Sequence, residues 1–93
     1  MNQNYASLSV ATSDMRERGF TKSFIPSEFD VLNPAEWRII ELYRFEGMNS
    51  ASDNSVVYGV KNIVSGEKGI IINAYGVYND EEVSNFIKLL KYE

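Results

Sequence analysis

Few residues in this chain have the chemistry for catalysis or metal binding. Its 93 residues include neither histidine nor cysteine, which removes the commonest general base, the thiolate nucleophile and thiolate-ligated zinc. The acidic residues placed nearest one another are Glu41, Glu46 and Asp53, in an extended segment and the loop after it. Carboxylates can act as acid and base or ligate a hard cation, but these can equally be solvated, with Glu41 paired to a lysine or arginine. Because no nucleophile or base accompanies them, we expect no catalytic residue, no metal site and no cofactor.

Two other short motifs that resemble ligand sites have simpler structural explanations. The segment SGEKG at 65–69 joins two predicted strands, whereas a phosphate-binding P-loop leads from a strand into a helix. Asp80, Glu81 and Glu82 begin a predicted helix, where acidic side chains complement the helix dipole. We therefore interpret the first motif as a hairpin turn and the second as a helix start.

Aromatic residues are the most concentrated chemical resource on the predicted strands. With a hairpin turn at Ser65 and Gly66 and a loop at 47–54, Tyr43 lies beside Tyr58, and Tyr58 lies opposite Asn73. The candidate binding residues of this face are Tyr43, Phe45, Tyr58, Asn73 and Tyr75, with Arg44 at its margin. Either this face is open to a ligand or partner, or the helices or the 20–34 segment cover it as core.

The opposite face of the same strands is aliphatic. It carries Ile70, Ile72 and Ala74, together with Gly59, whose small size allows a helix to approach closely. We therefore expect both helices to pack on this face and to leave the aromatic face less covered. Trp37, the single tryptophan, we interpret as a residue that closes the edge of the core rather than a ligand anchor.

Apolar spacing and turn residues divide the chain into two helices with strands between them. Leu8, Ala11 and Met15 recur at helical spacing, which predicts a helix over 8–18 that ends on a left-handed Gly19. An amphipathic helix is predicted to begin near Asn79 and to bury Val83, Phe86, Ile87 and Leu90. The segments between them predict short extended pieces at 22–25 and 28–32, one helical turn at 35–37, and strands at 38–46, 55–64 and 68–78.

These elements predict a single α+β domain over residues 1–93. We expect an antiparallel sheet of three to five strands, with the N-terminal and C-terminal helices packed on one face. The net charge of −4 and the scattered basic residues argue against nucleic acid as a partner. No apolar run approaches the ~20 residues that span a bilayer, and the N-terminus lacks a leader pattern, so we expect no membrane association and a cytoplasmic protein.

A family resemblance rests on four segments: RGFT at 18–21, YRFEGM at 43–48, DNSV at 53–56 and AYGVY at 74–78. These segments resemble a family of small uncharacterised bacterial proteins often labelled phosphoribosylpyrophosphate synthetase, and the likeness covers most of the chain. The acidic ribose-phosphate loop and the catalytic histidine of the true synthetase have no counterpart here. The resemblance therefore implies a bacterial domain without synthetase activity and transfers no site residue.

Two hypotheses for function follow from the aromatic face. The first is a non-catalytic cytoplasmic module that acts by self-association, as a homodimer, or by binding a protein partner through this face. The alternative is a protein that binds a small ligand or nucleotide with the same residues. A flat apolar face favours association, whereas a closed pocket with convergent polar groups favours a ligand.

Overall fold

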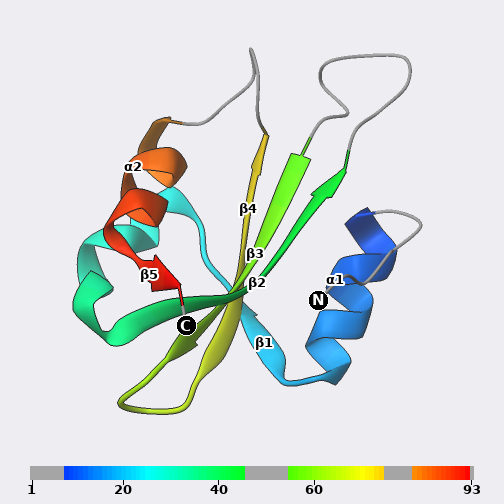
Figure 1. The fold of residues 1–93 in the computed structure, drawn as a ribbon, viewed down its shortest axis with the longest axis horizontal. Helices are drawn as coiled ribbons and strands as arrows, with labels where there is room; N and C mark the ends of the chain where they lie inside the picture. The colour runs from blue at the N-terminus through cyan, green and yellow to red at the C-terminus, as the bar shows by residue number, and fades with distance from the viewer. Residues whose placement is uncertain (1–7, 46–54, 75–80, 93) are drawn as a thin grey trace.

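The computed structural model describes residues 8–45, 55–74 and 81–92. In chain order these residues form α1 (Leu8–Glu17), β1 (Phe20–Ser23), the 3₁₀ helices η1 (Pro26–Val31) and η2 (Pro34–Glu36), β2 (Trp37–Phe45), β3 (Ser55–Asn62), β4 (Lys68–Ala74), α2 (Glu81–Leu89) and β5 (Lys91–Tyr92). The strands form one five-stranded sheet in the order β1-β4-β3-β2-β5 (Figure 1). The α+β class is therefore as predicted.

The sheet is mixed, so the expectation of a purely antiparallel sheet is wrong. The three long strands β2, β3 and β4 are antiparallel, as predicted. The two short edge strands run parallel to their neighbours, β1 beside β4 and β5 beside β2. Both edge strands reach the sheet through long connections rather than hairpins, which permits the parallel direction. Segments of four and two residues carry no sequence signal for direction.

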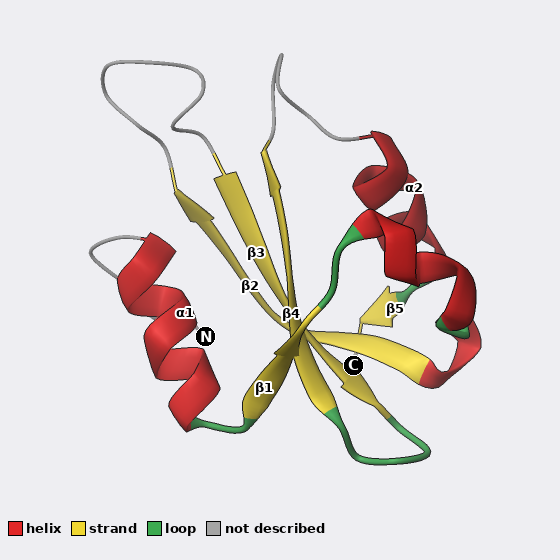
Figure 2. Cartoon of the chain, turned by 180° about the vertical axis from the view of Figure 1, so that it is seen from behind, coloured by secondary structure: helices red, strands yellow, loops and turns green. Residues whose placement is uncertain are grey.

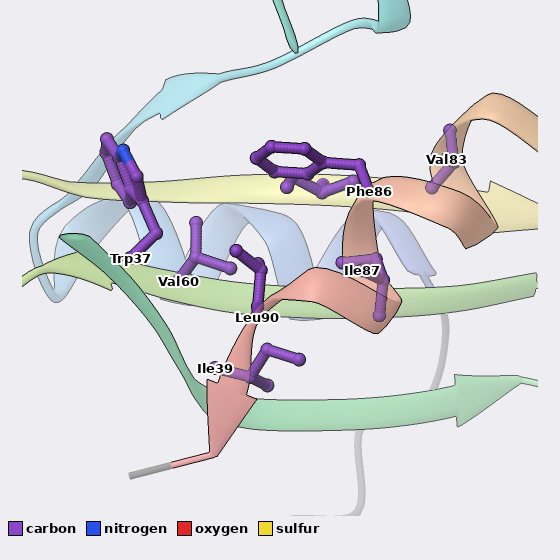
Figure 3. Packing of buried hydrophobic residues seen from close by; sticks show 8 residues of the cluster. Trp37, Ile39, Val60, Val83, Phe86, Ile87 and Leu90 are labelled. Atoms are coloured by element: carbon purple, nitrogen blue, oxygen red, sulfur yellow. The ribbon is translucent and has the colours of Figure 1, made fainter. Parts of the chain in front are cut away.

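The two helices cover opposite faces of the sheet, which corrects the expectation that both pack on one face (Figures 1 and 2). On one face α1 contributes Met15 to a buried cluster of Met15, Phe20, Val57 and Ile70. On the other face α2 covers a larger cluster of Trp37, Ile39, Val60, Ile71, Val83, Phe86, Ile87 and Leu90 (Figure 3). Val56 and Val57 are adjacent in β3 and both buried, and neighbouring strand residues point to opposite faces. Both faces therefore need a cover.

Two glycines allow this close packing, one on each face of the sheet. A Cβ added to Gly59 would lie 2.8 Å from Met15 Cε and 2.8 Å from Phe20 Cε1. A Cβ added to Gly69 would lie 2.5 Å from Phe24 Cε2. The prediction that Gly59 admits a helix is therefore confirmed for α1. On the α2 side, the absence of a side chain at Gly69 likewise makes room for the ring of Phe24.

The local predictions from turn residues mostly hold. Gly19 ends α1 with a φ of +105° and Gly66 forms the β3–β4 turn with a φ of +83°, as left-handed glycines should. The helical turn after Pro34 is present as η2, and the Asn33 Oδ1 accepts a hydrogen bond from the Ala35 amide. The extended piece predicted at 28–32 is instead η1. Its start is stabilised by the Ile25 amide, which donates to the Glu28 carboxylate at 2.9 Å, and by a proline in its first turn.

Candidate functional site

The structure divides the predicted aromatic face between the two sides of the sheet. Tyr43 and Phe45 pack against the α1 cluster, whereas Tyr58 packs against the α2 cluster. Tyr43 pairs with Val57, and the residue opposite Tyr58 is Leu42, one position away from the predicted register. Tyr75 lies outside the described residues.

A bulge in β2 causes this division. Trp37 and Ile39 lie on the α2 side, and the pairing register shifts between Ile39 and Glu41. One extra residue in a strand moves every later side chain to the opposite face. Tyr43 and Phe45 therefore face α1, although their even spacing from Ile39 predicts the α2 face. The β3–β4 register differs from the predicted one by two residues, and this even shift leaves the faces unchanged.

The remaining part of the predicted face is covered by α2. Asn73 is buried, and its Nδ2 donates to the Ser84 Oγ of α2 at 3.1 Å. Tyr58 is half-buried, and desolvation together with the nearby Tyr92 raises the pKa of its hydroxyl, although the Arg44 charge acts in the opposite direction. The alternative in which this face is helix-covered core is therefore the correct one for Tyr58 and Asn73.

Trp37 is a core residue, as predicted. Its side chain is 3% exposed and meets the Phe24 ring edge to face, with the ring centroids 5.1 Å apart. Figure 3 shows it at one end of the cluster under α2. No ligand role is needed to explain it.

A polar network connects the end of α1 to the sheet. The Arg18 guanidinium donates to both carboxylate oxygens of Glu41, with 2.7 Å from Nη2 to Oε1, and its Nε donates to Asp14 at 3.0 Å. The Tyr43 hydroxyl donates to the same Glu41 oxygen at 2.6 Å. The Lys68 Nζ donates to the Arg18 carbonyl at 2.7 Å and lies 4.4 Å from the centroid of the Phe20 ring. Glu41 is thus paired with an arginine, as the sequence allowed.

This network makes Glu41 a structural anion rather than an acid or base. The hydrogen bond from Arg18 lowers the pKa of Glu41 below its ordinary value of 4.5, and the Tyr43 hydrogen bond adds to this effect against the opposing desolvation. Both carboxylate oxygens are already hydrogen-bonded. The carboxylate stays charged and engaged at neutral pH, which makes it a poor proton shuttle. Glu46 and Asp53 lie outside the described residues.

The substitution Glu41→Gln should make stability less dependent on pH. A carboxylate with a lowered folded-state pKa contributes stability above its unfolded pKa and loses it as the pH falls through the folded value. We expect the wild type to exceed Glu41→Gln by about 1 kcal/mol in unfolding free energy at neutral pH. Urea unfolding should show this difference shrinking toward zero below about pH 4.

Glu67→Gln provides the control for this measurement. Glu67 pairs with Lys22 at 3.3 Å, and both side chains are about half exposed. Its loss should cost less than about 0.5 kcal/mol. A difference between wild type and Glu41→Gln that stays constant across the acidic range would contradict an ionic role for the Arg18–Glu41 pair.

A shallow groove of about 420 Å³ lies between η1 and α2. Six of its described lining residues are apolar, namely Pro26, Phe29, Leu32, Pro34, Phe86 and Leu89, and three are polar, namely Asp30, Glu82 and Asn85. Phe29 stacks on Phe86 with the centroids 4.4 Å apart and the planes at 10°. This stacked pair therefore joins the η1 wall of the groove to the α2 wall.

Leu89 in α2 is the residue from which this groove could have been suspected in the sequence. Val83, Phe86, Ile87 and Leu90 form the stripe that faces the sheet, and this stripe already accounts for the helix as amphipathic. Leu89 lies outside the stripe and is 62% exposed. Its groove neighbours Glu82, Asn85 and Phe86 precede it by seven, four and three positions, so they form a second helical stripe. The 26–34 wall has no such periodicity and could not be assigned from sequence.

No protein-family model, curated protein sequence or solved structure matches this chain. The likeness of the four sequence segments to a bacterial family therefore stays an expectation. Among the described residues, no group of three or more acidic side chains is placed to hold a metal ion, and no helix is long and apolar enough to cross a bilayer.

Proposed function

We propose that this chain is a non-catalytic protein-binding module whose docking site is the groove between η1 and α2. The observation that carries the proposal is the exposed Leu89 beside a groove with a stacked aromatic floor. A large aliphatic side chain at the edge of an apolar groove is typical of surfaces that receive a partner's side chains. The proposed surface replaces the tyrosine-rich face that the sequence suggested.

The state of Glu41 supports a non-catalytic role. Its carboxylate is held by Arg18 and Tyr43, and the lowered pKa disfavours proton transfer near neutral pH. Among the described residues, the groove lining offers two carboxylates and an amide, and no serine, threonine, lysine or tyrosine that could act as a nucleophile.

The shape and charge of the groove favour a protein over a small ligand or nucleotide. Its volume lies near the lower end of the roughly 300–1,000 Å³ range of ligand pockets, and such pockets bury most of their ligand. This groove is shallow and open to solvent. The charged residues among its described lining are Asp30 and Glu82, which would repel the phosphates of a nucleotide.

Binding of a leucine-containing amphipathic peptide tests this proposal. In ¹⁵N-labelled protein, the peptide should shift the amide signals of Phe29, Leu32, Asn85 and Leu89. The Leu89→Ala variant should bind it roughly tenfold more weakly, because the lost side chain contributes about 1.5 kcal/mol of buried apolar surface. Perturbations confined to α1 or the β3–β4 turn would contradict the proposed site.

Val64→Ala is the matched control for Leu89→Ala. Val64 is 74% exposed on the β3–β4 turn, outside the groove lining. Its truncation removes a similar exposed aliphatic side chain and should leave the peptide affinity unchanged. Sedimentation of the protein alone tests self-association: a dimer that Leu89→Ala dissociates would assign the groove to a second copy.

A further inference from the structure

The groove has an acidic residue on each of its two walls. Asp30 belongs to the η1 wall and Glu82 to the α2 wall. Among the described residues that line the groove, none is a lysine or arginine, and the whole chain carries a net charge of −4. An occupant with basic side chains on both sides of an apolar stripe would complement both walls.

The helix dipole explains the acidic residue on the α2 wall but not the one on the η1 wall. Glu82 lies in the first turn of α2, together with Glu81, where acidic residues stabilise the helix dipole. Asp30 lies near the end of η1. The acidic residue in the first turn of this 3₁₀ helix is Glu28, not Asp30. Asp30 therefore has no helix-dipole role, and its charge faces the groove beside an aromatic floor.

The length of the groove matches two turns of helix. Its α2 wall runs from Glu82 to Leu89, which is about 10 Å at 1.5 Å per residue. An apolar stripe with positions i, i+3 or i+4, and i+7 spans the same distance. The groove is walled by a 3₁₀ helix and an α-helix, and its described lining residues include no strand edge. The occupant therefore does not add to the sheet as a strand, and the two-turn length of the α2 wall favours a helix in the groove over an extended polyproline segment.

We propose that the groove binds a cationic amphipathic helix of a partner protein, with large aliphatic or aromatic residues on its apolar stripe and lysine or arginine on both flanks. This inference rests on the proposed function and adds the chemistry of the partner to it. The apolar stripe supplies affinity against Phe29, Phe86 and Leu89, and the flanking cations set specificity and orientation.

A pair of peptides that differ only in charge tests this inference. Each is an end-capped peptide of about 14 residues, long enough to form helix on binding, with the same leucine stripe and with about four flanking lysines or four glutamates. At low salt the lysine peptide should bind at least about tenfold more tightly by calorimetry. The difference should shrink strongly near 1 M salt, where the Debye length is about 3 Å.

Asp30→Asn is the variant that isolates the wall charge. It should weaken binding of the lysine peptide by about twofold to fivefold and slightly strengthen binding of the glutamate peptide. Glu17→Gln is the matched control, because it removes one negative charge from the exposed end of α1 and leaves the groove unchanged. Equal effects of the two variants would overturn the inference, because only net charge would then matter.

The outcomes separate this inference from the proposed function. Equal affinity of both peptides, with amide shifts in the groove, would overturn the cationic partner and leave the docking site in place. Absence of groove shifts with either peptide would overturn both proposals. A leucine peptide that binds best without any flanking charge would also contradict the cationic partner.

Discussion

Phe20→Ala should lower the free energy of unfolding by about 3–5 kcal/mol, which is a large part of the ~5–15 kcal/mol that stabilises a typical domain. Phe20 is fully buried and joins α1 to the sheet through Met15, Val57 and Ile70. Its ring also lies 5.5 Å from the Arg18 guanidinium carbon and 4.4 Å from Lys68 Nζ. Truncation therefore leaves a cavity and removes two cation–π contacts at once.

Equilibrium urea unfolding measures this loss, with two companion variants. Phe20→Leu keeps most of the apolar volume and should cost about 1–2 kcal/mol, which remains measurable if Phe20→Ala does not fold. Val31→Ala is the surface control, because Val31 is 84% exposed and should change stability by less than about 0.5 kcal/mol. A loss below about 1 kcal/mol for Phe20→Ala would show that α1 does not depend on this side chain.

Gly59→Ala and Gly69→Ala should each destabilise the protein by about 1–3 kcal/mol through overpacking. The sign is informative, because alanine in a strand interior normally gains about 0.5–1 kcal/mol over glycine. At Gly59 the new Cβ collides with Met15 and Phe20, and at Gly69 it collides with Phe24 and lies 3.3 Å from the Lys22 carbonyl oxygen. Destabilisation at both positions would show that both sheet faces are closely covered.

A double variant separates the collision from other effects of the added methyl group. Met15→Leu removes the terminal methyl that a Cβ at Gly59 would meet at 2.8 Å. Gly59→Ala should therefore cost less in the Met15→Leu background, with a coupling of about 0.5–1 kcal/mol. Gly66→Asn is the control, because nothing lies within 4 Å of that position and asparagine tolerates a positive φ. Stabilisation by Gly59→Ala would contradict the placement of α1.

The interpretation of Glu41 holds because it depends on simple chemistry, whereas Glu46 and Asp53 lie outside the described residues. Glu41 is engaged by a cation, as the alternative to catalysis proposed. The sequence could not name Arg18 as its partner, because the two residues are 23 positions apart and belong to different elements. Only the packing of α1 on the sheet brings the guanidinium to the carboxylate.

The predicted tyrosine-rich face is divided between the two sides of the sheet for a different reason. The bulge between Ile39 and Glu41 adds one residue to β2. The sequence has no glycine or proline at that position from which a bulge could be predicted. With the bulge, β2 gives Trp37 and Ile39 to the α2 cluster and Tyr43 and Phe45 to the α1 cluster. The bulge thereby lets β2 contribute apolar residues to both faces of the sheet, although their even spacing in the sequence would place them all on one face.

The sequence by itself determined the absence of histidine and cysteine chemistry and, in the local structure, both helices, the three long strands and the left-handed Gly19. The local features follow from residues within a few positions of one another, because backbone propensity, capping and turn conformation are short-range effects. The tertiary structure alone decided the direction of the edge strands, the face of each tyrosine, the Arg18–Glu41 pair and the groove between η1 and α2. These depend on burial summed over both faces of the sheet, where a shift of one residue reverses the environment of every side chain that follows.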